Sequence, residues 1–370
     1  MSFPSTMQAL SFSKHGGPEV MEKITVPFPT QQPGNVIMKV RPLPHTSPFT
    51  VYECYRIIRP VPGNGSRGQP SILNLDVSRK GLYPIKGFPQ LSGMEASGTI
   101  VALPTDETLL NDGQYKLRGL KLGSRVVVYT LGVHAEYASV PWAKVFPVPD
   151  SVSLETAAAA LLQGLTAITL MTESHNVQKG ESVLVHTVAG GLGLLFTQIA
   201  KSRGATVIGT TSTEAKSELA RSYGADHVIL YPKENTVDRV LEITKGEGVH
   251  SVFDGVGKDT FMENFKLVRR KGTLVNVGNA SGAVEPIAPL KLVDKNLKLV
   301  RPSMANYIVT PEESQHYGQE LMKLLETNKL KVEIAGTYPF TTEGVRQAQT
   351  DLTTPGGKVA GKLLIKIADE

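Results

Sequence analysis

A glycine run between two apolar, β-branched segments is the feature that most constrains how this chain folds. Residues 183–187 have the pattern of a buried strand, the run Ala189-Gly190-Gly191-Leu192-Gly193 and a helix-like stretch follow, and a second buried strand is predicted at 205–210. In such a strand–turn–helix unit the backbone N–H groups of the turn and the positive end of the helix face a pyrophosphate. The context on both sides of the glycines predicts half of a dinucleotide-binding unit.

The end of the second strand indicates which dinucleotide is bound. Sites for NAD place Asp or Glu about 20 residues after the glycines, where the carboxylate accepts hydrogen bonds from the ribose. This chain has Ser212 there and Lys216 one helical turn later, with Glu214 two residues beyond the strand end. A hydroxyl and an ammonium suit a 2′-phosphate, which a carboxylate would repel. We therefore predict NADPH; in the alternative interpretation Lys216 is an ordinary solvated helix lysine.

The pattern along the chain changes near residue 154. Short alternating or β-branched runs separated by Gly and Pro fill the first part, at 36–40, 96–101 and 124–129. From Leu154 onward helices and strands alternate, which predicts an α/β fold with a doubly wound parallel sheet and helices on both faces. The expected division is a β-rich domain of residues 1–153 plus 312–370, with an inserted nucleotide-binding domain of residues 154–311. A helix at 312–327 and a strand at 362–367 are expected in the returning part.

Composition limits the class of protein. The single cysteine, Cys54, excludes internal disulfides and fits a reducing compartment. No apolar stretch is expected to be long enough to cross a bilayer, and residues 1–23 contain no apolar core of a signal peptide, so we expect a cytoplasmic protein without a membrane partner. A net charge of +5 over 370 residues is small. It fits attraction of an anionic cofactor better than a nucleic-acid site.

Motifs spread over almost the whole chain resemble one family. They include the runs 15–20, 161–167, 189–195, 212–216, 223–229, 278–282 and 300–303. With these runs the chain is similar to the zinc-independent branch of the medium-chain dehydrogenase/reductase superfamily, and within it to the NADPH:quinone oxidoreductases of the zeta-crystallin type. The resemblance implies a GroES-like β-rich catalytic domain, an inserted Rossmann domain, a cofactor in the cleft between them, and a dimer or tetramer, of which we expect a homodimer.

The resemblance also implies residue roles, which remain expectations here. Thr166 is expected to hold the nicotinamide carboxamide, and Lys362 to reach a phosphate from the tail. Tyr83 is expected to face the substrate cleft as a catalytic residue. The alternatives are that Tyr83 is a packing residue and Lys362 a surface strand residue. The remaining expected cofactor contacts fall in the glycine turn, at the 2′-phosphate and at the nicotinamide ribose: Ala189, Gly190, Gly191, Leu192; Ser212, Lys216, Tyr231; Gly278, Asn279.

One stretch departs from the family pattern. The family places an Asn just before a short helix that contains a Tyr, and the corresponding helix region here is 47–56, with Ser47 or Pro48 where the Asn would fall and Tyr52 as the candidate catalytic tyrosine. A match at Asn74 is the alternative. Residues 57–80 form a Gly- and Pro-rich loop, which is typical of either a functional or a mobile segment.

The chemistry follows by elimination. One cysteine cannot supply the ligand sets of a zinc alcohol dehydrogenase, and Met94 stands where those enzymes carry a His, so no metal is expected. Hydride transfer to a conjugated acceptor needs no metal, because the acceptor delocalises the incoming charge. We expect a small-molecule quinone as acceptor. The alternatives are a reductase of activated alkenes, including enoyl-thioesters, and an NADPH- or RNA-binding protein with little turnover.

Overall fold

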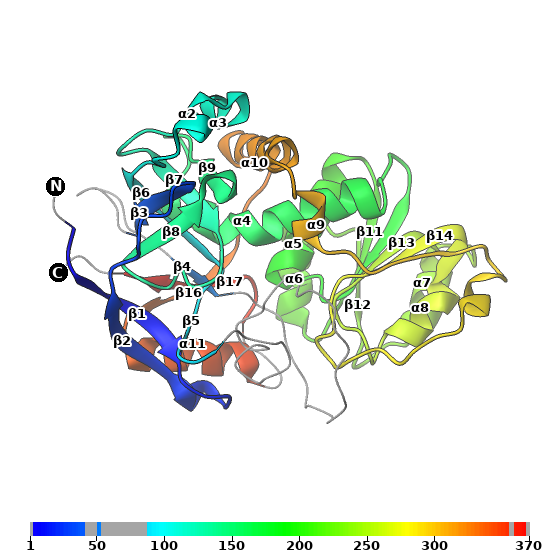
Figure 1. Cartoon of the computed structure of the whole chain (residues 1–370). Helices are drawn as coiled ribbons and strands as arrows, with labels where there is room; N and C mark the ends of the chain where they lie inside the picture. Colours follow the sequence, from blue (N-terminus) through cyan, green and yellow to red (C-terminus); the bar gives the residue numbers. More distant parts are fainter. Residues whose placement is uncertain (1–2, 41–49, 53–86, 355–358, 368–370) are drawn as a thin grey trace.

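A computed structural model describes residues 3–40, 50–52, 87–354 and 359–367 of the chain. The described residues form two lobes (Figure 1). The β-rich lobe comprises the strands of residues 6–147 and 334–366, and the parallel-sheet lobe comprises the strands and helices of residues 182–300. The precise domain limits predicted from the sequence, after 153 and after 311, remain a prediction.

The parallel-sheet lobe is built on six strands in the order β12-β11-β10-β13-β14-β15, with every neighbouring pair parallel. The alternation predicted from the sequence is confirmed, with element ends shifted by up to a few residues. The strands are β10 (Ser182–Val185), β11 (Thr206–Thr211), β12 (His227–Leu230), β13 (Val249–Asp254), β14 (Val268–Asn276) and β15 (Lys298–Val300), and the connecting helices are α5 (Gly191–Ser202), α6 (Glu214–Ser222), α7 (Thr236–Ile243) and α8 (Phe261–Leu267).

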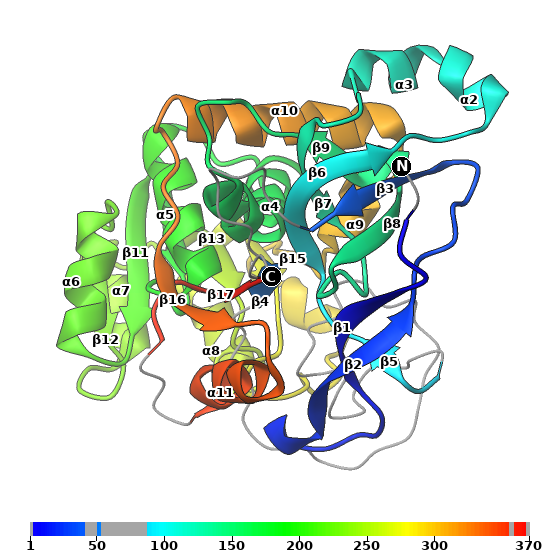
Figure 2. The ribbon, with the colours of Figure 1, turned by 90° about the vertical axis from the view of Figure 1, so that its left-hand side faces the viewer.

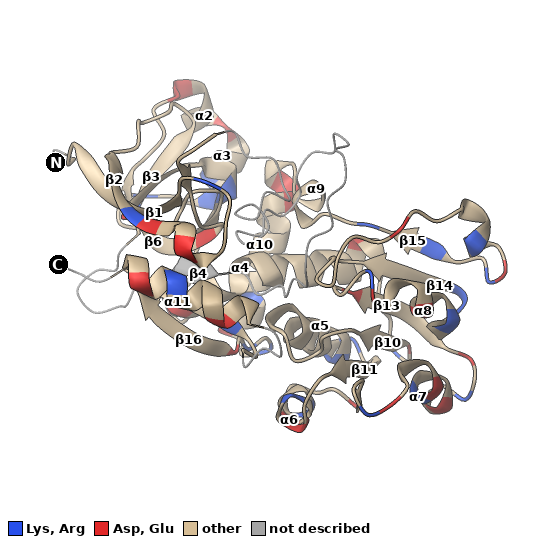
Figure 3. Cartoon of the chain, turned by 90° about the horizontal axis from the view of Figure 1, so that it is seen from below, with Lys and Arg blue, Asp and Glu red and all other residues tan. Residues whose placement is uncertain are grey.

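Helices cover both faces of this sheet because successive strand residues point to opposite sides. In β10, Val183 and Val185 pack into the core that contains α5, whereas Leu184 packs with Val240 of α7 and Phe261 of α8. Strands buried on both faces are expected to be continuously apolar, as residues 183–185 of β10 are. Charges lie mainly on the outer helices α6 and α7 and on loops, while α5 is almost free of them (Figure 3).

Within the described residues, the β-rich lobe holds a three-stranded and an eight-stranded sheet, and the C-terminal part of the chain returns into the larger one. β17 pairs in parallel with β16 and antiparallel with β4, so β17 lies between these two strands (Figure 2). The strands are β1 (Thr6–Phe12), β2 (Met21–Pro27), β3 (Asn35–Lys39), β4 (Thr50–Tyr52), β5 (Gln90–Leu91), β6 (Glu95–Ala102), β7 (Arg125–Tyr129), β8 (Tyr137–Pro141), β9 (Val145–Pro147), β16 (Ile334–Pro339) and β17 (Lys362–Lys366).

Helix α4 (Leu154–Thr169) runs between the lobes and is buried along almost its whole length. Ser153 caps its first turn, and a π-helical turn, Leu170–Ser174, extends it. One hydrophobic core contains α4 together with Val127 of β7 and Val183 of β10, so the two lobes share their packing. The other α-helices in the described residues are α2 (Glu107–Asn111), α3 (Gly113–Arg118), α9 (Met304–Tyr307), α10 (Pro311–Glu326) and α11 (Thr342–Thr353).

The helix Leu154–Ser174 corrects one expectation. With 21 residues it is, by length and composition, apolar enough to cross a membrane, although the sequence analysis expected no such segment. It is the core helix of the two lobes, and 89% of its most apolar window is buried inside the protein. Its low polarity therefore has a structural reason, since both lobes pack against it.

A buried ion pair joins β6 and β17 of the β-rich lobe, and its carboxylate also contacts α4. The ammonium of Lys362, at the start of β17, lies 2.6 Å from Oε1 of Glu95 on β6, and both side chains are fully buried. The other carboxylate oxygen of Glu95 accepts the backbone N–H of Leu162 at 2.7 Å. Burial raises the pKa of Glu95, while Lys362 and the Leu162 N–H act in the opposite direction. Three elements distant in sequence are thereby held at one carboxylate.

We predict that replacing one partner is far worse than replacing both. Lys362→Met leaves the Glu95 carboxylate buried without its counter-charge and should lower the free energy of unfolding by about 3–5 kcal/mol. The double variant Glu95→Gln/Lys362→Met should lose much less than the two single losses combined. Urea unfolding of the wild type, both single variants and the double variant measures the coupling. Additive losses would contradict a direct interaction between the two side chains.

Candidate functional site

The turn between β10 and α5 has the geometry of an anion site. Thr187 follows β10 with a φ of 55°, a left-handed conformation that is unusual for a β-branched residue. The N–H of Gly190 donates to the Thr187 carbonyl at 2.9 Å, and α5 begins at the next residue. Within the described residues no side chain caps this helix. Its first N–H groups are therefore available to a bound anion at the positive end of the helix.

Two glycines of this turn lie close to neighbouring atoms. A Cβ on Gly193 would stand 2.4 Å from the Thr187 carbonyl oxygen, and a Cβ on Gly191 would stand 2.5 Å from Oε1 of Gln163 on α4. Both distances are shorter than real Cβ atoms show. The glycines thus allow α5 to approach the turn and α4, which is the use of glycine in dinucleotide-binding turns.

A buried polar chain holds the turn in place. Nδ1 of His186 lies 3.0 Å from the Thr210 hydroxyl, and Nε2 lies 2.8 Å from Oδ1 of Asn264. The Asn264 amide donates to Asp254, so its oxygen faces the histidine as an acceptor and Nε2 of His186 carries the proton. The strand predicted at 183–187 includes His186. In the structure β10 ends at Val185, so His186 directly follows the strand. These contacts tie together the carboxyl ends of β10, β11 and β13.

At the end of β11 the structure brings together the residues predicted to select the cofactor. Ser212 follows the strand directly, and Thr213 caps α6 by accepting the backbone N–H of Lys216. Glu214, the one carboxylate close to this strand end in sequence, forms an exposed ion pair with Lys233 at 2.9 Å. A positively charged residue and a hydroxyl therefore lie where a 2′-phosphate is expected.

One pocket collects these groups over the carboxyl ends of the parallel strands, where open α/β sheets bind ligands. It contains seven of the residues predicted to bind the cofactor: Ala189, Gly190, Gly191, Leu192, Ser212, Lys216 and Tyr231. Sequence reasoning missed the others that line it: His186, Thr187, Gly193, Phe196, Thr211, Phe253, Gly255, Val277, Ala280, Leu352 and Val359. Leu352 and Val359 come from the C-terminal segment that returns to the β-rich lobe, so both lobes contribute to the pocket.

Four predicted cofactor residues do not line the pocket. Gly278 and Asn279 lie next to it, between the lining residues Val277 and Ala280. Thr166 is buried in α4, and its hydroxyl donates to the Leu162 carbonyl at 2.7 Å. Lys362 is fully buried and bound to Glu95, so neither the predicted phosphate contact nor the alternative of a surface lysine describes its environment. Its ammonium contacts the buried carboxylate of Glu95 and is not exposed to solvent.

The two predicted catalytic tyrosines are not placed by the structure. Tyr83 lies outside the described residues, as do Asn74, Cys54 and the loop 57–80. Tyr52 ends β4, and only its backbone is described. The predicted helix at 47–56 is wrong at residues 50–52, which form a strand between β6 and β17. The Thr-Val-Tyr sequence has high strand propensity, which fits this pairing.

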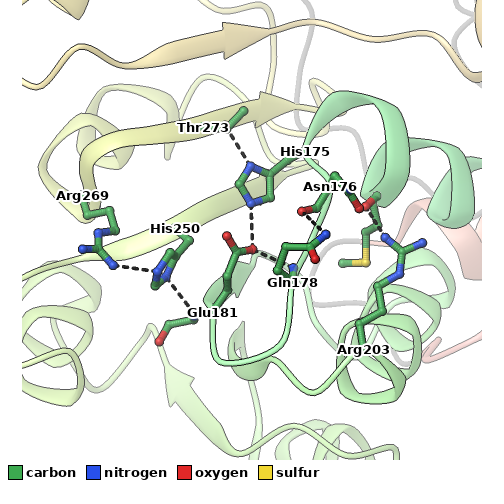
Figure 4. A network of polar contacts seen from close by, with 10 residues as sticks. His175, Asn176, Gln178, Glu181, Arg203, His250, Arg269 and Thr273 are labelled. Carbon is green, nitrogen blue, oxygen red and sulfur yellow. Dashed lines mark hydrogen bonds and ion pairs between the residues drawn. The ribbon is translucent and has the colours of Figure 1, made fainter.

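A second polar cluster lies near the starts of the parallel strands, away from the pocket at their carboxyl ends (Figure 4). Glu181 accepts hydrogen bonds from Nε2 of His175 and from the backbone N–H of Gln178, both at 3.0 Å. Nδ1 of His250 accepts the Ser182 N–H, and Arg269 contacts its other nitrogen. Burial, followed by the charge of Arg269, lowers the pKa of His250. No residue of this cluster belongs to the lining of the pocket described above, and its contacts hold the starts of β10, β13 and β14.

Among the described residues no group of three or more His, Cys, Asp or Glu side chains has the arrangement of a metal site. The only cysteine of the chain, Cys54, lies in the part that the structure does not describe.

Known proteins match both the sequence and the fold. The family described as zinc-binding dehydrogenase matches residues 191–334. A quinone oxidoreductase of Salmonella typhimurium is 34% identical over 343 residues, which are 92% of this chain and 94% of that protein. A 2-haloacrylate reductase of Burkholderia sp is 35% identical over 214 residues, 57% of this chain and 64% of that protein.

A solved structure of Escherichia coli quinone oxidoreductase complexed with NADPH has a TM-score of 0.81 to this chain at 30% identity, covering 97% of this chain and 100% of that one. A GroES-like β-rich lobe with an inserted Rossmann sheet and a glycine-turn pocket defines a medium-chain dehydrogenase/reductase. Within that superfamily the chain belongs to the zinc-independent quinone oxidoreductase family.

We predict that Lys216 sets the preference for NADPH over NADH. A hydrogen bond to a charged group contributes about 1.5–3 kcal/mol, and partial exposure reduces this. Lys216→Ala should weaken NADPH binding by roughly tenfold or more and leave NADH binding nearly unchanged, because NADH lacks the 2′-phosphate. Fluorescence titration of both cofactors measures this. Lys266→Ala, which removes an exposed lysine on α8, is the control. Equal losses for the two cofactors would mean that Lys216 does not contact the 2′-phosphate.

Proposed function

We propose that this protein is an NADPH-dependent oxidoreductase that transfers hydride to quinones without a metal. The observation that carries the proposal is the pocket in which the uncapped start of α5, Ser212, Lys216 and Tyr231 face one space. Family membership supports the same activity, since the similar Salmonella typhimurium protein is named quinone oxidoreductase and the similar Escherichia coli structure holds NADPH.

The chain's part in the reaction is binding and orientation. Bound NADPH supplies the hydride. The first N–H groups of α5 would hold the pyrophosphate, and Ser212 and Lys216 would hold the 2′-phosphate. His186 keeps the turn fixed through Thr210 and Asn264. Phe196, Phe253 and Val277 make part of the pocket wall apolar, which keeps water away from the bound cofactor. A quinone accepts the hydride because its conjugated ring spreads the developing charge onto its oxygens.

We propose Tyr83 and Tyr52 as hydroxyl donors toward the reduced acceptor, and Thr166, Gly278 and Asn279 as neighbours of the nicotinamide end. Reduction of activated alkenes is the second candidate, because the chain is also similar to a 2-haloacrylate reductase.

We predict that the protein reduces 1,2-naphthoquinone faster than it reduces activated alkenes. NADPH oxidation followed by absorbance should be at least about tenfold faster with the quinone than with a 2-enoyl-CoA or 2-haloacrylate, a difference of ~1.4 kcal/mol in transition-state free energy. It should be close to zero without an acceptor. Dialysis against a strong chelator should leave the rate unchanged. A faster alkene reaction would make the second candidate the better one, and a loss restored by zinc would overturn the metal-free proposal.

We further propose a cytoplasmic homodimer. The single cysteine supports a reducing compartment. β15 ends the parallel sheet and pairs within the described residues only with β14, and the turn before it exposes Leu290 at 76% and Val293 at 58%. An open strand edge next to exposed apolar side chains suits a symmetric contact with a second copy.

The oligomer has its own test. Leu290→Asp/Val293→Asp should raise the dimer dissociation constant by at least about tenfold, because the charges would be desolvated in the contact. Sedimentation velocity over a range of protein concentrations measures it. Leu122→Asp, a similarly exposed leucine in the β-rich lobe, is the matched control. Unchanged association of the double variant would place the contact elsewhere.

A further inference from the structure

A buried carboxylate lies at the carboxyl end of β13, between two residues that line the pocket. Asp254 is fully buried, and its neighbours Phe253 and Gly255 both face the pocket. Within the described residues this carboxylate forms no ion pair and accepts only from neutral donors, which are the backbone N–H groups of Val256 and Gly257, the Thr260 hydroxyl and the Asn264 amide. An ionised carboxylate cannot donate, so every group around it must present a hydrogen.

The first group of contacts holds two loops at the pocket. Oδ1 of Asp254 accepts the backbone N–H of Val256 at 2.8 Å and that of Gly257 at 3.2 Å. The carbonyl oxygen of Asp254 accepts the N–H of Val277 at 2.7 Å. Gly255 and Val277 line the pocket. One residue therefore holds the segments that follow β13 and β14, and both segments contribute to the pocket wall.

The second group of contacts leads to the glycine turn. Oδ2 of Asp254 accepts from the Asn264 amide nitrogen at 2.8 Å, so the amide oxygen of Asn264 faces Nε2 of His186, also at 2.8 Å. That oxygen needs a hydrogen, so Nε2 carries the proton and the bare Nδ1 accepts the Thr210 hydroxyl at 3.0 Å. His186 lines the pocket just before the glycine turn. The carboxylate thus sets the direction of every hydrogen bond in this series.

We propose that Asp254 is a positioning residue for the cofactor. Its carboxylate sets the hydrogen-bond direction through Asn264 to His186, and by this series and by the two loops it keeps the pocket in its binding shape. This inference rests on the NADPH binding in the proposed function. Asp254 is fully buried and acts through its neighbours, not by touching the cofactor. The glycine turn serves the pyrophosphate, which NADPH and NADH share, so Asp254 affects the affinity for both.

The variant Asp254→Asn reverses the series while keeping the size of the side chain. Its amide oxygen still accepts the two backbone N–H groups, so its NH₂ group faces Asn264. The Asn264 amide then turns over and presents its own NH₂ group to His186. We expect the proton of His186 to move from Nε2 to Nδ1, which then donates to the Thr210 hydroxyl. NMR of protein with isotope-labelled histidine distinguishes protonated from bare ring nitrogens, and His186→Gln identifies the signals of this residue.

The exchange variant Asp254→Asn/Asn264→Asp tests the direction of the series independently. It returns an acceptor to the side of His186, so the proton should return to Nε2. The spectra are recorded at mildly alkaline pH, which keeps the imidazole neutral beside the new carboxylate. Asp226→Asn is the matched control. That carboxylate accepts the backbone N–H of Val207 near the start of β11, away from the pocket, so its loss should change neither the proton position nor cofactor affinity.

Cofactor affinity tests whether the series acts on the pocket. Asp254→Asn replaces hydrogen bonds to a charged acceptor by weaker neutral ones and should weaken NADPH and NADH binding by the same factor, roughly fivefold. The exchange variant should recover part of this loss. If Asp254→Asn does not fold, Asn264→Leu takes its place in the titration with the same expected loss, because it interrupts the series before His186.

Several outcomes would overturn the inference. They are a proton on Nδ1 of His186 in the wild type, an unchanged proton position in Asp254→Asn, wild-type affinities in the variant used for titration, and a loss confined to NADPH. A wild type that binds neither cofactor would mean that the proposed function has failed. The histidine spectra need no cofactor, so they show separately whether Asp254 sets the direction of the series.

Discussion

The contact of Glu95 with Lys362 and the Leu162 N–H is the interaction on which the arrangement of the two lobes depends. It joins a strand from the first part of the β-rich lobe, the last strand of the chain and the helix that leads into the parallel sheet. Both charged side chains are buried, so removing either one leaves the other without its counter-charge. Because α4 is fixed in this way, Gln163 has a defined position against Gly191 at the start of α5, and Gly191 lines the pocket.

The cofactor pocket depends on local sequence patterns and on side-chain contacts between residues that are far apart in the chain. Glycines and an uncapped helix start follow from the sequence of the turn alone, and the strand end with Ser212 and Lys216 follows from the spacing of a βαβ unit. The side-chain contacts that hold the turn in place do not follow from the local sequence. His186 keeps the turn in place through a threonine on the next strand and an asparagine on α8, and it is their side-chain chemistry that fixes its proton on Nε2. Backbone donors thus bind the ligand, while buried side chains determine where those donors point.

Most of the parallel-sheet lobe could be predicted because its strands and helices have strong and different periods, from β10 through β14. Local pattern was insufficient elsewhere. Lys362 was expected near a phosphate, but its partner lies 267 positions earlier and no spacing rule connects them. β16, α11 and the lining residues Leu352 and Val359 were not predicted, because their roles arise only when the returning segment packs against the other lobe. Residues 50–52 form a strand through pairing with β6 and β17, which their own neighbours in sequence do not reveal.

The insertion of β17 between β16 and β4 also bears on how the protein is made. During synthesis at about 5–20 residues per second, the carboxylate of Glu95 leaves the ribosome on the order of tens of seconds before Lys362 exists. Throughout that interval the β-rich lobe lacks both its closing strand and the charge that its interior requires. The intervening residues include every strand of the parallel sheet, whereas the β-rich lobe lacks β16 and β17 until the segment 334–366 has been made. A chain cut short before residue 362 therefore retains a complete glycine turn but leaves an acidic side chain and an open sheet edge for chaperones and proteases to recognise.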